Sequence, residues 1–455
     1  MHSAISIRED IRIQLKDKIR YAFEESLFSE KIIYRIELPI QSINMIAWLS
    51  NQRSETRLFW SSRDKDFETA GIGLAYGLQG TRFIDIDAVF HELNKYLVGD
   101  THGLKFFGGF AFSPEALDHH WENFGSYRFI LPKFEILRRE NNFYLACNLF
   151  GNSSHPKRLE ETLAELDRID FDDTFKDTVM TNAKHRIDEP GKEAWNESVG
   201  QALGDIQDKK IDKVVLARRS TFEFENEIHS LMLFSKLKNL SEDCYHFYFE
   251  PYSNQVFLGA SPERLYKRIG KTILTEAIAG TRPRGTTPSS DESLRNDLLK
   301  SAKDRHEHLF VAEAIKESLN PICKELAQEK TLEALSLSGG HHLLTSFKGN
   351  IAKNITDTDI FTALHPTPAT GGWPTPKALK LISKLEPFKR GWYTGAIGFV
   401  GQNECDFAVG IRCGLIVKNK LFLYAGAGIV EGSNAEGEWE EIETKIGNFL
   451  RIFEK

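Results

Sequence analysis

The sequence has 455 residues, of which 41% are hydrophobic and 27% are charged, with a formal net charge of −7. This composition is ordinary for a globular protein, and the length is sufficient for two or three domains with a large core. Because the chain is negative overall, we expect neither nucleic acid nor an anionic membrane surface as a partner, and an anionic ligand would need a local positive site.

The cysteines and the hydropathy pattern indicate a reducing compartment. The five cysteines are widely spaced and form no C-x-x-C pair, so neither a disulfide framework nor a zinc site is indicated. The first 16 residues lack the apolar stretch of a secretory signal. No apolar run approaches the length of a membrane span. We therefore expect a cytoplasmic protein without membrane attachment.

Residues 1–190 are expected to form a subdomain rich in antiparallel strands. Strands are predicted at residues 32–39, 45–50, 58–62, 105–112, 127–131, 134–138 and 143–149, and helices at 5–28, 85–97 and 156–167. The glycine-rich segments 71–77 and 108–109 do not open a helix after a strand, so they favour close strand packing over a phosphate loop. This part shows no catalytic set of residues.

Residues 191–455 are expected to form the region that carries the chemistry. Helices are predicted at residues 195–208, 231–240 and 376–384, and strands at 213–218, 245–250, 255–260, 272–278, 392–400, 407–417 and 421–430. The loop 279–285, rich in glycine, proline and arginine, offers free backbone N–H groups to an anion. Arg412 lies among apolar residues of a predicted strand, so we expect it to point inward and to be paired.

Two stretches place carboxylates three residues apart on predicted helices. Asp304 and Glu307 open a helix that continues to residue 318, and Glu438 and Glu441 open the last helix, 438–453. A charged cluster on a helix is most often only a solvated face. Two such pairs facing each other, however, would suit a hard cation such as Mg²⁺, with room for water and an anionic substrate.

The histidines do not indicate a zinc site. His341 and His342 are adjacent, so on a strand they point to opposite faces. His306 and His308 are two residues apart and do not share a helix face.

Seven segments occur in an order that resembles the chorismate-utilising enzymes, which include isochorismate, salicylate, anthranilate and aminodeoxychorismate synthases. They are KVVLAR at 213–218, GASPERL at 259–265, AIAGTRPRG at 277–285, SAKDRHEH at 301–308, LHPTPATGG at 364–372, YTGAIGF at 393–399 and AGAGIVEGSNAEGEWEEIETK at 425–445. The resemblance spans roughly residues 190–455. It implies an α/β (α+β) fold, a large sandwich of central antiparallel sheets with flanking helices.

Within this family the sequence most resembles isochorismate synthases. Lys213 stands where isochorismate and salicylate synthases carry the lysine that activates water, and anthranilate synthases usually have another residue there. Ala279 stands where aminodeoxychorismate synthases often carry a nucleophilic lysine. The resemblance therefore implies Mg²⁺-dependent addition of water to chorismate at C2 with loss of the C4 hydroxyl, giving isochorismate.

The same resemblance implies a role for each site residue. Lys213 would be the general base and must be neutral to act, whereas Glu263 would be the general acid and must be protonated. Glu307 and Glu441 would hold Mg²⁺, and Asp304 and Glu438 would act directly or through water. Chorismate would contact Gly280, Thr281, His342, Tyr393, Arg412, Gly428 and Lys445. A monomer is expected.

Three alternatives stay open at this point. A salicylate synthase would form isochorismate and then eliminate pyruvate in the same pocket. An anthranilate synthase would need ammonia, and Lys213 argues against it. A non-catalytic binding protein on the same fold would have no physical need for Lys213, Glu263, Glu307 and Glu441 together. We favour menaquinone over siderophore biosynthesis as the pathway.

Overall fold

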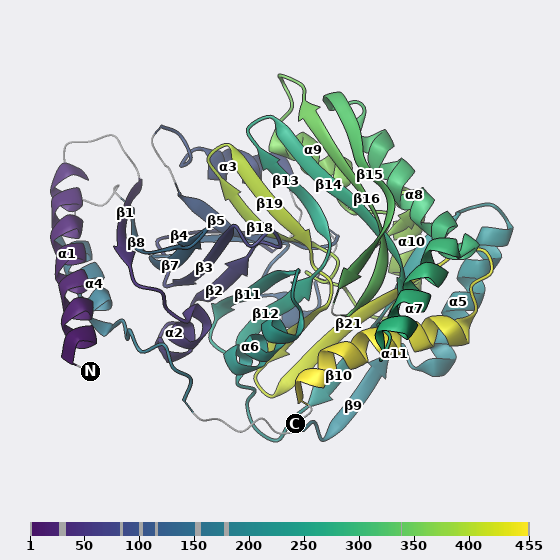
Figure 1. The fold of residues 1–455 in the computed structure, drawn as a ribbon, viewed down its shortest axis with the longest axis horizontal. Coiled ribbons are helices and arrows are strands. Elements are labelled where there is room, and N and C mark those ends of the chain that lie inside the picture. The colour runs from purple at the N-terminus through teal and green to yellow at the C-terminus, as the bar shows by residue number, and fades with distance from the viewer. Residues whose placement is uncertain are drawn as a thin grey trace.

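Two antiparallel sheets stack face to face, and helices cover their outer faces (Figure 1). The computed structural model describes residues 2–26, 33–81, 85–99, 103–113, 117–150, 156–176, 182–337 and 339–453. Among these residues, no helix is both long enough and apolar enough to cross a membrane. The predicted fold class, a sandwich of central antiparallel sheets with flanking helices, is confirmed.

The larger sheet has twelve strands drawn from both ends of the chain. They are β1 (Ile33–Ile40), β2 (Arg57–Ser61), β3 (Phe67–Ile72), β7 (Phe134–Arg139), β8 (Asn142–Phe150), β9 (His185–Glu189), β10 (Lys213–Glu223), β11 (Tyr245–Tyr252), β12 (Gln255–Ser261), β17 (Gly372–Trp373), β20 (Cys413–Val417) and β21 (Lys420–Ile429). Their order is β1-β8-β7-β3-β2-β11-β12-β20-β21-β10-β17, and β9 also pairs with β10. The early and late strands meet where β2 pairs with β11.

The smaller sheet has nine strands in the order β15-β16-β14-β13-β19-β18-β5-β6-β4. They are β4 (Tyr76–Gly80), β5 (Lys105–Phe110), β6 (Tyr127–Leu131), β13 (Arg264–Ile269), β14 (Thr272–Arg282), β15 (Cys323–Leu337), β16 (Gly340–Ile351), β18 (Ala396–Gly401) and β19 (Glu404–Val409). Here β18 joins β5. A Cβ on Gly109 would lie 2.0 Å from the Ala396 carbonyl oxygen, so this glycine serves strand packing, as expected.

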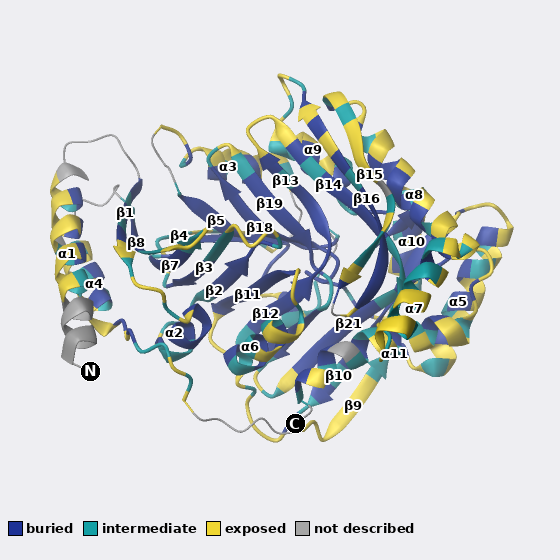
Figure 2. Ribbon diagram, in the orientation of Figure 1, coloured by how far each residue is buried: buried dark blue, intermediate teal, exposed yellow. Residues whose placement is uncertain are grey.

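Eleven α-helices are described, and most pack on the outside of the two sheets. They are α1 (His2–Ser26), α2 (Met45–Asn51), α3 (Ile86–Asn94), α4 (Pro156–Arg168), α5 (Lys192–Gln207), α6 (Ser230–Leu240), α7 (Pro288–Lys300), α8 (Ala302–Leu319), α9 (Asp357–Leu364), α10 (Thr375–Leu385) and α11 (Ala435–Leu450). The core between the sheets is aromatic, with Trp60, Phe107, Phe257, Trp392 and Phe399 buried together. Figure 2 shows the buried strands inside and the exposed helix faces outside.

The strand predicted at residues 45–50 is wrong, because these residues form helix α2. The Asn44 side chain caps the helix by accepting the Ala47 backbone N–H at 3.2 Å. All residues from Met45 to Leu49 are buried, and a short apolar run of this kind does not distinguish a buried strand from a buried helix.

Three predicted boundaries in the second half also differ from the structure. Residues 407–417 form two strands, β19 and β20, separated by a turn in which Arg412 has φ of 50°. The chain passes there from the smaller sheet to the larger one. The strand predicted at 392–400 begins only at Ala396, because residues 392–395 form a turn. The predicted loop 279–285 is partly a strand, since β14 continues to Arg282 through a bulge.

The packing of α11 predicts which apolar residues on the carboxylate-bearing helices matter for stability. Ile442 is 0% exposed in the core beneath the larger sheet, whereas Leu309 on α8 is 53% exposed. We expect Ile442→Ala to lower the free energy of unfolding by about 2–5 kcal/mol, and Leu309→Ala to change it by no more than about 0.5 kcal/mol. Urea unfolding followed by circular dichroism measures both, and equal effects would contradict this assignment of the core.

Candidate active site

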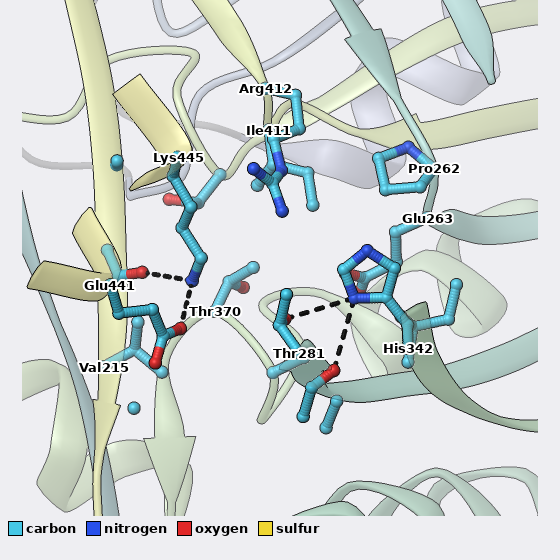
Figure 3. A pocket seen from close by; sticks show the side chains of 18 of the residues that line it. Val215, Pro262, Glu263, Thr281, His342, Thr370, Ile411, Arg412, Glu441 and Lys445 are labelled. Carbon is cyan, nitrogen blue, oxygen red and sulfur yellow. Dashed lines mark hydrogen bonds and ion pairs between the residues drawn. The ribbon is translucent and has the colours of Figure 1, made fainter. Parts of the chain in front are cut away.

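A cavity of about 260 Å³ lies between the ends of β10 and β21, helices α8 and α11, and strand β14 (Figure 3). It is lined by all thirteen residues that the sequence predicted for the site. They are Lys213, Glu263, Gly280, Thr281, Asp304, Glu307, His342, Tyr393, Arg412, Gly428, Glu438, Glu441 and Lys445. Residues up to 232 positions apart in the chain therefore share one cavity, since the first is Lys213 and the last is Lys445 (445 − 213).

Lys213 begins β10 and lies beside α8. Its ammonium is 3.0 Å from the Glu307 carboxylate, and its side chain is only 1% exposed. On the neighbouring strand β21, Gly428 pairs with Val215. A Cβ on Gly428 would lie 2.6 Å from Glu307 Oε1 and 3.1 Å from Lys213 Cε. A side chain at position 428 would therefore have to displace the Glu307 carboxylate from its place beside Lys213.

Glu263 and Arg412 both lie where the chain crosses between the two sheets. Glu263 is in the connection from β12 to β13, and Arg412 is in the connection from β19 to β20. The two crossings are hydrogen-bonded to each other. The Val409 N–H donates to the Glu263 carbonyl at 3.0 Å, and the Ala260 N–H donates to the Arg412 carbonyl at 3.1 Å. The acid and the cation are thus fixed next to each other by backbone contacts.

Burial makes Glu263 a weak acid. Loss of solvation, reinforced by the nearby Glu276 carboxylate, raises the pKa of Glu263 to about 8, against the opposing effect of Lys213 and Lys445. The carboxyl group is therefore largely protonated at neutral pH. A protonated carboxyl in a cavity can donate a proton.

The four predicted metal-binding carboxylates each face a cationic side chain. The pairs are Lys213–Glu307 at 3.0 Å, Arg282–Asp304 at 2.6 Å, Lys303–Glu438 at 3.2 Å and Lys445–Glu441 at 2.7 Å. Lys303 also interacts electrostatically with Glu307 and Glu441, and although burial opposes the effect, these carboxylates raise its pKa. The Lys303 ammonium thus contacts Glu438 and is also influenced by the charges of two further carboxylates.

The carboxylates fit a magnesium ion as a set of hard oxygen donors. No group of three or more histidine, cysteine, aspartate or glutamate residues is arranged to hold a metal within the described residues. Mg²⁺ commonly uses one or two protein carboxylates and keeps several waters, so it does not need such a group. Glu438, Glu307 and Glu441 all raise the pKa of Lys303 against the effect of burial, so this part of the cavity stabilises positive charge.

Arg412 differs from the expectation that it would be paired. Its side chain lines the cavity, as predicted, but its guanidinium makes no hydrogen bond or ion pair with any residue in the described part of the chain. In Figure 3 it points into the open space opposite Glu263 and His342. A guanidinium with free donors beside a cavity is suited to bind a carboxylate.

His342 is neutral and oriented. Its Nδ1 lies 3.2 Å from the Gly280 carbonyl oxygen and 3.2 Å from the Thr281 hydroxyl. A carbonyl oxygen only accepts, so Nδ1 donates to it and Nε2 is left as an acceptor. Burial, with the nearby Arg412 charge, lowers the pKa of His342 to about 3. His342 can therefore accept a hydrogen bond from a hydroxyl group but cannot bind an anion by charge.

Two residues that pair with the carboxylates were missed by the sequence analysis. Lys303 and Arg282 both line the cavity. The signal was present, because Lys303 directly precedes Asp304 and Arg282 follows Thr281. Both lie inside segments that the resemblance had singled out, but their partners, Glu438 for Lys303 and Asp304 for Arg282, are set by tertiary contacts.

Comparisons with known proteins agree over nearly the whole chain. The family model described as "Chorismate binding enzyme" matches residues 18–454. "Isochorismate synthase 2, chloroplastic" of Arabidopsis thaliana is 32% identical, over 94% of this chain and 81% of its own length. Isochorismate synthase MenF of Escherichia coli (strain K12) is 29% identical, over 98% and 99%. The solved structure of the Escherichia coli MenF, described as menaquinone-specific, superposes with a TM-score of 0.85 at 26% identity, covering 97% of this chain and 100% of that one.

The raised pKa of Glu263 predicts a pH-dependent effect of Glu263→Gln on stability. The folded protein keeps the proton up to about pH 8, whereas the unfolded chain releases it near the ordinary value of 4.5. The wild type therefore loses about 1.4 kcal/mol of stability per pH unit in this window, and the neutral glutamine does not. In urea unfolding, we expect the free energy of unfolding of Glu263→Gln to rise relative to that of the wild type as the pH increases from 5 to 8.

The exposed residue Glu440 on α11 provides the matched control. Glu440→Gln should leave the pH dependence of stability unchanged. A difference between Glu263→Gln and wild type that is constant with pH would contradict the buried, protonated state of Glu263.

Proposed function

Because the chain belongs to the chorismate binding enzymes and has isochorismate synthase homologues over nearly its full length, we propose that it converts chorismate to isochorismate. The observation that carries this proposal is the joint placement of Lys213 and a protonated Glu263 in a cavity with an unpaired arginine. Addition of water with loss of hydroxide needs both a base and an acid. Lys213 would supply the base, and Glu263 would supply the acid.

The reaction exchanges one hydroxyl for another. To act as the base, Lys213 would first release to solvent the proton of the ammonium form that is paired with Glu307. It then takes a proton from water as the water oxygen bonds to ring C2. The double bond shifts, the C4–O bond breaks, and Glu263 gives its proton to the departing hydroxyl, which leaves as water. One water enters and one leaves, so the conversion is a net isomerisation. His342 Nε2 would accept a hydrogen bond from a substrate hydroxyl and so orient the leaving group.

Chorismate is a dianion, and the cavity provides positive groups for it. Arg412 would bind one carboxylate through its free, fork-shaped set of donors. Lys445, already 2.7 Å from the Gly426 carbonyl, would add positive charge on the side of α11. Backbone N–H groups near Gly280, Thr281 and Gly428, and the Tyr393 hydroxyl, would complete the anion pocket.

Glu307 and Glu441 are the proposed holders of Mg²⁺, and Asp304 and Glu438 would contribute directly or through water. Bound there, the ion would offset the repulsion between these acids and the substrate carboxylate. Lys303 pairs with Glu438, and Lys445 pairs with Glu441. For the ion to bind these carboxylates, the two lysines would have to give up part of these contacts.

We propose menaquinone biosynthesis as the pathway, since a solved relative that covers 97% of this chain is described as menaquinone-specific. A salicylate synthase is the second candidate, because its first step would use the same residues. We propose that the protein acts as a monomer, since residues of one chain bring all thirteen predicted site residues into one cavity.

The first test is a chromatographic product assay with chorismate and no added ammonia, with Mg²⁺ and then with EDTA. We expect isochorismate with Mg²⁺ and at least a tenfold loss with EDTA, restored by excess Mg²⁺. Salicylate together with pyruvate would reassign the chain to the salicylate synthases. No product from folded protein in either condition would favour a binding protein.

Substitution of the proposed base and acid gives a second test. Lys213→Ala and Glu263→Gln should each lower kcat by about 100- to 10,000-fold, the range that general acid–base groups contribute. Chorismate should still bind, as measured by calorimetry, because Arg412 and Lys445 are intact. Lys420→Ala, at an exposed lysine at the far end of β21, should leave kcat unchanged. Near wild-type turnover in either site variant would refute its role.

A further inference from the structure

The partly buried Arg63 and the buried Glu276 hold the peptide groups on both sides of Glu263. Arg63 Nη1 donates to the carbonyl oxygen of Pro262 at 2.7 Å. Glu276 Oε1 accepts the backbone N–H of Arg264 at 2.9 Å. Arg63 and Glu276 are themselves joined by two hydrogen bonds, one of them from Nη2 to Oε2 at 2.7 Å. A single ion pair thus hydrogen-bonds to the backbone of Pro262 and of Arg264, the residues on either side of Glu263.

Low solvent exposure and the geometry of the arginine fork make the Arg63–Glu276 ion pair rigid. The Arg63 side chain is 15% exposed and that of Glu276 is 3% exposed. The planar fork of arginine bonds to the carboxylate and to a carbonyl at once, which lysine could not reproduce. Neither residue is among those that line the cavity, so their contacts act on Glu263 through its backbone.

The pair also brings a charge close to Glu263. After burial, the Glu276 carboxylate is the largest influence that raises the pKa of Glu263. Other ionisable or charged groups around Glu263 come from several elements: Lys213 on β10, His342 on β16, Lys445 on α11, Arg264 on β13 and Arg412 at the crossing to β20. Lys213 and Lys445 act in the opposite direction to Glu276. Glu276 thus raises the pKa of Glu263, whereas these two lysines lower it.

Arg63 is also the contribution of the first part of the chain to this site. It lies in the connection between β2 and β3, while every residue that lines the cavity is Lys213 or later. We infer that Arg63 and Glu276 are positioning residues that fix the backbone of Glu263 and so aim its carboxyl group for proton donation. The inference rests on the function proposed above.

Glu276→Gln tests the electrostatic part. The amide oxygen can still accept the Arg264 N–H, but the negative charge is gone, so Glu263 should become a stronger acid. The enzyme needs the protonated form, and activity falls as pH rises through the pKa of Glu263. We therefore expect the alkaline limb of the pH profile of kcat/KM to move to lower pH in this variant.

Arg63→Lys tests the geometric part. The lysine keeps the positive charge, and Glu276 keeps its contact with the Arg264 N–H. The arginine fork that bonds to Glu276 and to the Pro262 carbonyl at the same time is lost. We expect kcat to fall by about 10- to 100-fold with KM changed less than about threefold, because small misplacement of a reacting group costs rate. This milder variant also serves if Glu276→Gln does not fold.

The ion pair between Arg57 and Glu250 provides a matched control. Arg57 Nε lies 2.6 Å from Glu250 Oε2, Glu250 is 1% exposed, and the pair likewise joins the first part of the chain to the second. It does not touch the peptide groups around Glu263. Glu250→Gln should destabilise the fold to a degree comparable to Glu276→Gln, while the alkaline limb stays at the wild-type pH.

A second measurement separates failure of this inference from failure of the proposed function. The infrared band of the protonated Glu263 carboxyl, identified by its loss in Glu263→Gln, should titrate at lower pH in Glu276→Gln than in wild type. A wild type without isochorismate synthase activity would overturn the proposed function and leave this titration to decide the electrostatic role of Glu276. If the wild type is active and both the band and the alkaline limb are unmoved in Glu276→Gln, the inference is overturned.

Discussion

The site depends on two backbone hydrogen bonds that join the places where the chain crosses between the sheets. One crossing carries Glu263 and the other carries Arg412. The Val409 N–H donates to the Glu263 carbonyl, and the Ala260 N–H donates to the Arg412 carbonyl. Because a strand crossing has no ladder of its own, these bonds determine where the two side chains point. The proposed acid and the proposed carboxylate-binding group are therefore placed by the sandwich itself and not by a separate loop.

Charge compensation explains the rest of the cavity. Burying charges is costly unless they are paired, and each of the four acids of α8 and α11 that line the cavity is matched by a lysine or an arginine. The pairing leaves Arg412 as a cation with no partner among the described residues that could satisfy it. A cavity balanced in this way has its own internal counter-charges and still presents one unpaired guanidinium, the group proposed to bind a substrate carboxylate.

The sequence predicts much of this arrangement because the relevant segments are short and local. The spacing of Glu438 and Glu441, or of Asp304 and Glu307, is visible directly in the chain, and the resemblance supplied partners for them. Residues whose importance arises from tertiary contacts were not visible. Arg63 lies in an ordinary turn in a part of the chain that showed no catalytic residues, and the break at Arg412 was hidden within one apolar stretch.

The pairings of β2 with β11 and of β5 with β18 mean that residues 1–190 and 191–455 share both sheets. Because β9 also pairs with β10 across this point, cutting the chain near residue 190 and separating the halves would uncover six backbone edges, three on each piece. Exposed edges of this kind pair readily with other chains. The protein is therefore a poor candidate for expression as separate halves, whereas co-expressed halves have complementary edges through which they could reassemble.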